Sequence, residues 1–303
     1  MFDALDQIQQ QTKKTLFMSQ TRTIVIGEQL ARRGVHDPVD FLWRTGNKNL
    51  TSWILVSKIP AKDLLRKAKE LESVPADAWK LYFLNKNSHP SSEPMELFHF
   101  LPSLDQEGLQ ATGAGIMPAQ DGTVMKISET AVFRHDKMVG WLTEEETGLL
   151  KWIKKEIGPR TLTMNMDYGK HPVSMSLSHF HSRIVSGTQG GKITMNIRLR
   201  AEAEVAVAPI DMDFTNLPAV KKLETRLNER IKTSTEQMLN KICSKYQSDI
   251  IGFGKIIHRK DPQRWKKIKN NWNERLPEIK VTLDAHTHIV SSGIERVSRS
   301  ERK

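Results

Sequence analysis

A long amphipathic segment near the C-terminal end constrains the fold of this 303-residue chain more than any other feature. Its apolar residues recur at the spacing of one face of an α-helix. They are Leu217, Val220, Leu223, Leu227, Ile231, Met238, Ile242 and Tyr246. A helix over residues 216–246 would be roughly 40 Å or more in length, at about 1.5 Å per residue, and could cross a whole β-sheet.

The segments on either side of this helix carry the period of β-strands. Apolar and polar residues alternate in residues 162–166, 173–177 and 193–199, and Gln189-Gly190-Gly191 turns the second of these back into the third. Alternation buries one face of each strand and leaves the other in water, as in antiparallel sheets. Residues 279–290 add a final strand. The pattern therefore predicts an antiparallel sheet that is packed by the long helix.

The first part of the chain alternates helical and extended patterns. The β-branched run Thr23-Ile24-Val25-Ile26 predicts a buried strand, and residues 50–59 predict a second one. Helices are expected to begin at Glu28, at Asp37-Pro38 and at Pro60, the last two because proline suits the first helical turn. This alternation is typical of an α/β-type section.

The middle part is short and richer in strands. Its expected extended pieces are residues 97–101, 113–117, 127–133 and 138–142, the last two paired as a β-hairpin. Thr143 and Glu146 have the spacing of a capping box, in which each satisfies a backbone N–H of the other. A helix is expected to begin there and to end at Gly158-Pro159.

These patterns together predict a multi-domain α+β fold. An N-terminal α/β-type domain covers residues 1–86, a small middle β-rich domain covers 95–158, and a C-terminal α+β domain covers 159–295. The polar, proline-bearing residues 85–94 are the linker between the first two. The basic tail, residues 296–303, is expected to be disordered.

Two global features exclude whole classes of protein. No run of about 18 apolar residues exists, so the sequence predicts no membrane-spanning helix. The sole cysteine, Cys243, excludes an internal disulfide and a cysteine-based zinc site. Because it lies in the long helical pattern, we expect it to be a small buried hydrophobe.

The net charge of +11 is concentrated near the end of the chain. Residues 252–280 contain nine Lys or Arg against three Asp or Glu, so this segment supplies +6 of the total. Basic surface of this kind favours anionic partners such as lipid headgroups, nucleic acid or acidic protein faces. The alternative is an ordinary solvated helix face.

The same segment mixes glycine and aromatic residues in a recognisable order. Gly252 and Gly254 flank Phe253, which indicates a tight turn whose phenyl ring fills a core. Asp261-Pro262 has the form of an N-cap followed by proline at the first helical position. Trp265, Ile268 and Trp272 then share one helical face, and we expect the two tryptophans to pack inward.

This segment resembles the C-terminal domain of the Ger(x)C family, the C subunits of bacterial spore germinant receptors. The resemblance lies in residues 246–254, in His258-Arg259-Lys260-Asp261-Pro262, and in Trp265-Lys266 with Asn271-Trp272. Earlier pieces are also similar, namely Thr23-Ile24-Val25-Ile26-Gly27-Glu28, Ala131-Val132-Phe133 and Lys137-Met138-Val139-Gly140-Trp141-Leu142. The resemblance covers nearly the whole chain, in the family's order.

The resemblance implies a non-enzymatic lipoprotein on the outer face of the spore inner membrane. It would act as a docking scaffold for the membrane-embedded A and B subunits, and it would be needed to trigger germination. Family members begin with a lipoprotein signal and a lipid-bearing cysteine, so an anchor is expected upstream of Met1. The family supplies no catalytic residue, cofactor or metal. The expected interaction residues are Gly252, Phe253, Gly254, His258, Arg259, Trp265, Lys266 and Trp272.

Two other functions remain open from the residues alone. His179 with His181, and His286 with His288, lie two apart, so each pair faces one side of a strand, and paired strands could gather four imidazoles around a hydrolytic metal. Their alternation with apolar residues instead places them on the wet face of the sheet. The basic segment with its tryptophans would otherwise serve nucleic-acid binding, although no recognised module surrounds it.

Overall fold

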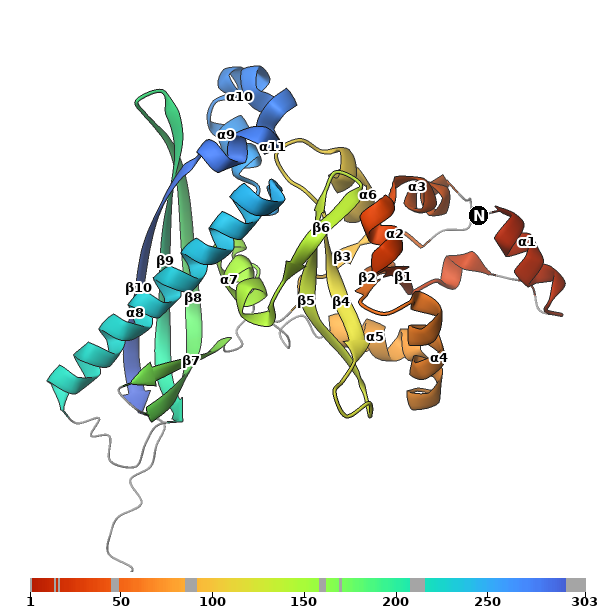
Figure 1. Cartoon of the computed structure of the whole chain (residues 1–303), viewed down its shortest axis with the longest axis horizontal. Helices are drawn as coiled ribbons and strands as arrows, with labels where there is room; N and C mark the ends of the chain where they lie inside the picture. Colours follow the sequence, from red (N-terminus) through yellow and green to blue (C-terminus); the bar gives the residue numbers. More distant parts are fainter. Residues whose placement is uncertain are drawn as a thin grey trace, which may run out of the picture. The chain divides into compact units, whose positions relative to one another are not determined.

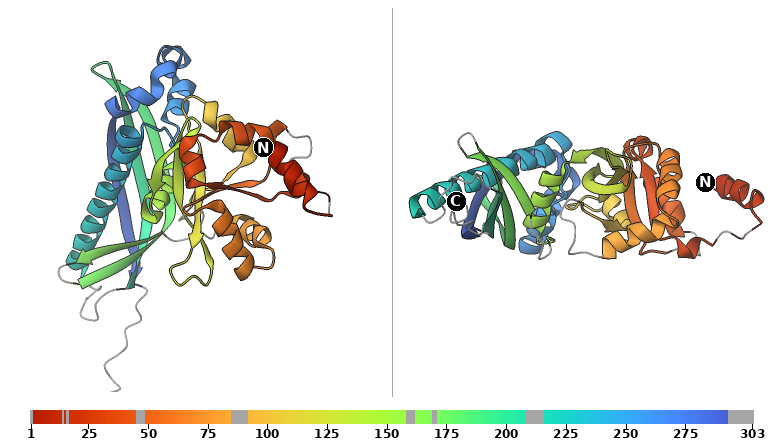
Figure 2. Two further views of the ribbon diagram at one scale, coloured as in Figure 1. Left: turned by 45° about the vertical axis from the view of Figure 1, so that its right-hand side comes forward. Right: turned by 90° about the horizontal axis from the view of Figure 1, so that it is seen from below.

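The structure is a computed structural model that describes residues 2–13, 15, 17–44, 49–84, 92–157, 162–168, 171–207 and 216–292. The chain forms two compact units, each assembled from separate segments. Unit 1 consists of Met1–Thr147 and Asn240–Pro277, and unit 2 consists of Gly148–Leu239 and Glu278–Lys303. Figures 1 and 2 show their elements in sequence colours.

Unit 1 is built on a six-stranded mixed sheet with the order β1-β2-β4-β5-β6, in which β3 also pairs with β2. Strands β1, β2 and β4 are parallel, β5 and β6 follow antiparallel as a hairpin, and β3 is antiparallel to β2. The strands are β1 (Thr23–Gly27), β2 (Trp53–Ser57), β3 (Met95–Glu96), β4 (Thr112–Pro118), β5 (Met125–Arg134) and β6 (Lys137–Leu142).

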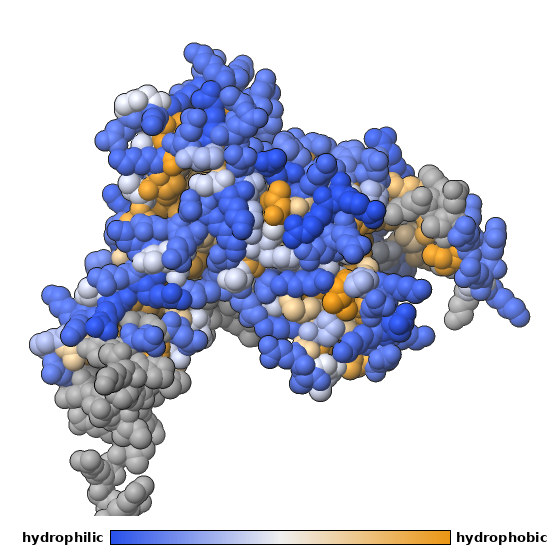
Figure 3. Space-filling model, in the orientation of Figure 1, coloured by the Kyte–Doolittle hydropathy of each residue, from blue (hydrophilic) through white to orange (hydrophobic). Residues whose placement is uncertain are grey.

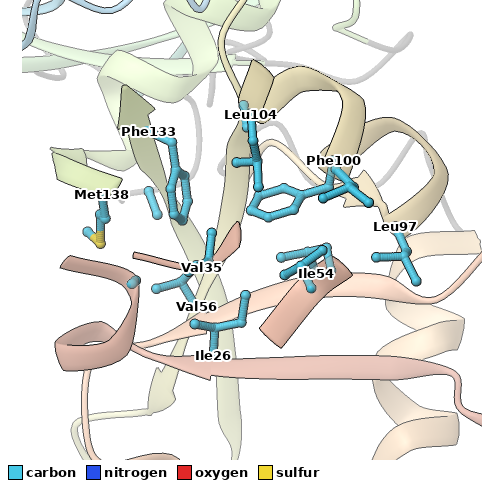
Figure 4. Packing of buried hydrophobic residues seen from close by; sticks show 14 residues of the cluster. Ile26, Val35, Ile54, Val56, Leu97, Phe100, Leu104, Phe133 and Met138 are labelled. Atoms are coloured by element: carbon cyan, nitrogen blue, oxygen red, sulfur yellow. The ribbon is translucent and has the colours of Figure 1, made fainter. Parts of the chain in front are cut away.

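Helices cover both faces of this sheet, so its inner strand β2 is buried throughout. Ile54 and Val56 point into one apolar cluster with Phe100 and Phe133 (Figure 4). Trp53 and Leu55 point into the other cluster, with residues of α4 and α5. Burial on both faces explains why β2 is a continuous apolar run rather than an alternating one. The helices before β4 are α1 (Phe2–Gln10), α2 (Glu28–Arg33), α3 (His36–Arg44), α4 (Ala61–Leu71), α5 (Pro75–Leu84) and α6 (Leu97–Asp105), with a 3₁₀ turn at Met18–Gln20.

A second set of short helices completes unit 1 after the chain returns from unit 2. The set begins with a π-helical turn at Lys241–Tyr246, where Gln247 adopts a left-handed conformation that ends it. The later elements are α9 (Phe253–Lys260), α10 (Pro262–Ile268), α11 (Trp272–Arg275) and 3₁₀ turns at Lys269–Asn271 and Leu276–Glu278.

Unit 2 is a four-stranded sheet with one long helix. The strand order is β10-β9-β8-β7, and β7, β8 and β9 are antiparallel neighbours. Helix α8 (Leu217–Asn240) crosses the sheet diagonally (Figure 1) and buries Leu223, Leu227 and Ile231. Helix α7 (Glu144–Lys154) begins in unit 1 and continues in unit 2. The strands are β7 (Leu162–Tyr168), β8 (His171–Gln189), β9 (Lys192–Val207) and β10 (Lys280–Ser292).

The multi-domain α+β class predicted from the sequence is confirmed. So is the capping box, since Thr143 N donates to Glu146 Oε2 at 2.8 Å and Glu146 N donates to Thr143 Oγ1 at 3.2 Å. The prediction of an extended piece at residues 97–101 is wrong, because this stretch is the start of α6. Its buried residues Leu97, Phe100, Leu101 and Leu104 follow helical spacing instead.

The final strand also differs from the prediction, because β10 joins the antiparallel strands in parallel with β9. The two compact units also differ from the three predicted domains. Residues on both sides of the expected linker contribute to one sheet, since β2 pairs with β4 and with β3. Residues 85–91 of that linker, Gly158-Pro159 and the basic tail 296–303 lie outside the described residues.

Candidate interaction site

The segment after the π-helical turn is organised around a fully buried carboxylate, that of Asp249. Its Oδ1 accepts hydrogen bonds from the backbone N–H groups of Gly252 (2.7 Å) and Phe253 (2.9 Å). Its Oδ2 accepts from Gly254 N (2.7 Å) and from the indole Nε1 of Trp272 (2.8 Å). Gly252 has a φ of 88°, a left-handed conformation that favours glycine. Successive N–H groups in such a turn converge on one anion.

Burial and hydrogen bonding act in opposite directions on Asp249. Desolvation raises the pKa of its carboxyl above the usual aspartate value, while the four N–H donors lower it. No cation is needed to hold the carboxylate in place, because each oxygen has two donors. The arrangement fixes the start of α9 and ties it to α11.

Close packing of two backbone segments explains why residue 254 is a glycine. A Cβ atom on Gly254 would lie 2.4 Å from the Cα of Gly108 and 2.6 Å from the Trp265 ring. The two segments are joined by Lys255 N, which donates to Gly108 O at 3.2 Å, and by Gln110 N, which donates to Asp249 O at 2.9 Å. A larger residue at position 254 would separate them.

The aromatic residues form the inner side of this region. Phe253 is fully buried, and Trp265 and Trp272 are 5% and 2% exposed. The two indoles meet edge to face with ring centroids 5.3 Å apart. Asp261 caps α10 as predicted, accepting from Arg264 N at 2.9 Å, with Pro262 at the first helical position. The two tryptophans lie on α10 and α11, separated by a 3₁₀ turn, rather than on one continuous helix.

The outer side of the same helices is basic and exposed. His258 stacks on the Trp265 ring at a centroid distance of 6.1 Å, so the buried indole supports an exposed imidazole. Arg259 follows on α9, and Lys266 and Lys267 lie on α10; all three are exposed. We refer to His258, Arg259, Lys266 and Lys267 as the basic surface.

Hydrogen bonds connect this segment to the sheet of unit 1. Ser248 Oγ donates to Phe133 O at 2.5 Å, and Tyr246 Oη donates to Trp141 O at 3.0 Å. The Tyr246 ring lies over Gly140, where an added Cβ would approach the ring within 2.3 Å. The π-helical turn therefore delivers Tyr246 onto a strand that has no side chain at the contact point.

The structure divides the eight expected interaction residues into two groups. Gly252, Phe253, Gly254, Trp265 and Trp272 are buried, so they support the site and do not form its outer surface. His258, Arg259 and Lys266 are exposed. Sequence reasoning missed Asp249 and Gly108, which hold the turn. A signal for Asp249 was present, because an aspartate three residues before Gly252 has the spacing of a side-chain cap.

The two histidine pairs are not brought together. Strand β9 lies between β8 and β10, so it separates one pair from the other. His179 contacts Glu202 at 2.9 Å, His288 contacts Glu224 at 2.8 Å, and all four imidazoles are exposed. Among the residues that the structure describes, no group of three or more His, Cys, Asp or Glu could hold a metal ion. The predicted wet-face location is therefore confirmed, and the geometry does not support the hydrolase hypothesis.

The nucleic-acid hypothesis relied on the tryptophans as a stacking platform. Both rings are buried against each other and against the Asp249 turn, so bases cannot reach their faces. Within the described part of the chain, no helix is both long and apolar enough to cross a bilayer.

Comparison with known proteins gives a consistent result along the chain. Residues 1–116 match the family described as spore germination protein N-terminal domain, and residues 128–293 match the one described as spore germination B3/GerAC like, C-terminal.

Individual relatives come from Bacillus subtilis (strain 168). Spore germination protein YndF is 25% identical, over 92% of this chain and 69% of that protein. Spore germination protein KC is 22% identical, over 96% and 76%, and spore germination protein B3 is 20% identical, over 92% and 75%. The crystal structure of the GerBC protein superposes with a TM-score of 0.73 at 16% identity, covering 93% of this chain and 83% of that one, which shows a shared fold.

Proposed function

The chain belongs to the spore germination B3/GerAC-like family, and we propose that it is the C-type subunit of a germinant receptor. In this role it is a non-enzymatic docking scaffold. It is held by a lipid anchor on the outer face of the spore inner membrane, and it assembles with membrane-embedded A and B subunits. The names of its relatives as spore germination proteins support this assignment.

The observation that carries the docking role is the rigid support beneath the basic surface. Long side chains usually lose conformational freedom when they bind a partner, and a fixed backbone limits the further cost of ordering. Here α9 and α10 are held by the buried Asp249 carboxylate and by the Trp265–Trp272 pair. The cations Arg259, Lys266 and Lys267 are therefore presented in a fixed arrangement.

Electrostatics indicates the chemistry of the partner. Exposed Arg and Lys side chains steer and orient acidic surfaces more than they add affinity. We expect the partner to be an acidic face of another receptor subunit, so that reversing these charges weakens assembly. The fold of unit 1 would be unaffected, because the three side chains are exposed.

Spores that carry the triple variant Arg259→Glu, Lys266→Glu, Lys267→Glu test the proposal. We expect loss of nutrient-triggered germination, with normal amounts of the protein in the membrane fraction. The matched control is Lys62→Glu with Lys69→Glu on α4, which reverses two exposed cations of the same unit elsewhere. Normal germination of the triple variant, or an equal defect in the control, would contradict docking through the basic surface.

A further inference from the structure

Strand β10 is an edge strand whose outer side is covered over only part of its length. Thr287 N donates to Asn228 Oδ1 at 2.7 Å, and Ile289 N donates to Glu224 Oε1 at 2.8 Å. Asn228 and Glu224 lie one helical turn apart on α8, so they satisfy alternate N–H groups along the strand. This end of β10 is closed to further pairing.

The first half of β10 also directs backbone N–H groups outward, but no described side chain of α8 accepts hydrogen bonds from them. The register with β9 is regular from Lys280 to Ile289, so Val281, Leu283 and Ala285 direct their backbone groups to the same outer side as Thr287. No described residue pairs with their outward N–H groups. Native proteins usually block such edges, because an open edge is a template for another strand.

The course of α8 explains why the cover stops. The helix crosses the sheet diagonally and leaves β10 as it proceeds (Figure 1). Lys232 lies one helical turn after Asn228, on the same face of α8. Its Nζ lies 4.0 Å from Glu236 Oε1 on its own helix rather than at β10, and both side chains are more than half exposed.

The side chains beside the open edge are apolar and incompletely covered. Val281, Leu283 and Ala285 are only partly buried, whereas their partners on β9 are fully buried. Those partners are Met195, Ile197 and Leu199. Figure 3 shows hydrophobic surface on this unit above α8. An added strand would cover part of it.

We propose that this open edge pairs with the same edge of a second copy of the chain, antiparallel and centred on Leu283. The sheets of the two copies then form one continuous sheet with twofold symmetry. Leu283 lies opposite its own equivalent, and Val281 lies opposite Ala285 of the other copy. Residues with outward backbone groups exchange both hydrogen bonds in such an antiparallel pair.

The occupant is a second copy because the edge is self-complementary. On the apolar face, every cross-strand pair in this register joins two apolar residues. On the polar face, Lys280 lies opposite His286 of the second copy, and Thr282 lies opposite Asp284 of the second copy. No acidic side chain therefore lies opposite another. Lys280 is also the diagonal neighbour of the second copy's Asp284, an attractive arrangement.

Sedimentation equilibrium of the purified chain tests the association. We expect a monomer–dimer equilibrium that Leu283→Lys weakens about tenfold or more, because two ammonium groups then face each other. The matched control is Val185→Lys on β8, which makes the same change at an exposed position on the far side of β9 from β10. It should leave the equilibrium unchanged. Circular dichroism establishes that both variants are folded.

A symmetric cross-link identifies the register. Residue 283 faces itself across the twofold axis, at a Cα separation of about 5.5 Å that suits a disulfide. Leu283→Cys should therefore form a covalent dimer under mild oxidation, whereas Thr282→Cys, which lies opposite Asp284, should not. The native Cys243 is buried and does not compete.

Four results would overturn the proposal. A chain that stays monomeric at every concentration excludes self-pairing, and so does a dimer that Leu283→Lys does not weaken. A covalent dimer of Thr282→Cys that forms as readily as that of Leu283→Cys excludes the register. Cross-linking of Leu283→Cys to a different receptor subunit, with no covalent dimer, would assign the edge to a partner's strand instead.

Discussion

The indole of Trp272 donates a hydrogen bond to the carboxylate of Asp249 at 2.8 Å, across 23 residues of chain. The same carboxylate oxygen accepts from Gly254 N, so one buried anion joins the start of α9 to α11. The stability of this region therefore depends strongly on Asp249. A buried donor that loses its acceptor lowers the free energy of unfolding by more than a hydrogen bond normally contributes to it.

Replacing Asp249 with Asn should destabilise unit 1 by about 2 to 5 kcal/mol, because an amide NH₂ cannot accept and leaves two buried donors unpaired. Urea unfolding measures the loss. Asp261→Asn is the matched control, since Asp261 is an exposed N-cap and asparagine caps helices equally well. A free energy of unfolding for Asp249→Asn within about 0.5 kcal/mol of the parent value would refute this account of the turn.

Truncating Phe253 to Ala should cost about 3 to 5 kcal/mol, because its ring is fully buried and the substitution leaves a cavity. Thermal or urea unfolding detects the change. Phe17→Ala provides a comparison, since the Phe17 ring is 62% exposed. If both variants lose the same small amount of stability, Phe253 does not fill a core.

Adding a methyl group at Gly140 should destabilise the protein by about 1 to 3 kcal/mol, because the new Cβ would lie 2.3 Å from the Tyr246 ring. The measurement is again the free energy of unfolding. Gly27→Ala is the control, since a Cβ there makes only an ordinary contact of 3.6 Å with Ala61. A tolerated Gly140→Ala would show that the π-helical turn can shift.

The thiol of Cys243 should react very slowly with thiol reagents in the folded protein. Burial, with a smaller effect from Asp249, raises its pKa to about 12, so almost no thiolate is present at neutral pH. The absorbance of the released thionitrobenzoate measures the rate of the reaction. Unfolding the protein in urea should make the reaction fast. Rapid labelling of the native chain would mean that the segment opens readily.

Asp284 should titrate below the usual aspartate range, because Arg200 Nη2 donates to its Oδ2 at 2.8 Å and lowers its pKa. A lowered pKa in the folded state stabilises the protein above the unfolded pKa, and this contribution is lost as pH falls through the folded pKa. Both side chains are about half exposed, so the contribution is below about 1 kcal/mol. Carboxyl carbon NMR should show the pKa of Asp284 rising in Arg200→Gln; an unchanged titration would count against the pairing.

Local patterns predicted much of the fold because each element has a strong local signal. The β-branched run at residues 23–26 became β1, and the helix expected to begin at Glu28 became α2, which ends at Gly34 with a φ of 140°. The long helical pattern became α8 and the π-helical turn. The π-helical geometry itself was not predictable, because Ile242 and Tyr246 fit an ordinary α-helix equally well.

Other features depend on information that local patterns do not contain. The run Leu97-Phe98-His99-Phe100-Leu101 is short and apolar, and such runs are ambiguous between strand and helix. Alternation in residues 280–292 identifies the face of β10 that is buried but not its direction relative to β9. The spacing of the two tryptophans was enough to predict that they are buried. The role of Asp249 could not be predicted from a local pattern, because it depends on a hydrogen bond from Trp272, which lies on a separate helix.

The interleaving of the two units has a consequence for biosynthesis. Unit 1 closes with Asn240–Pro277, and unit 2 closes with Glu278–Lys303, so neither has all its pieces until the residues after Leu239 have emerged from the ribosome. Both therefore finish folding only after that point, and a nascent product that stops before β10 would leave the edge of β9 unpaired and open to another strand.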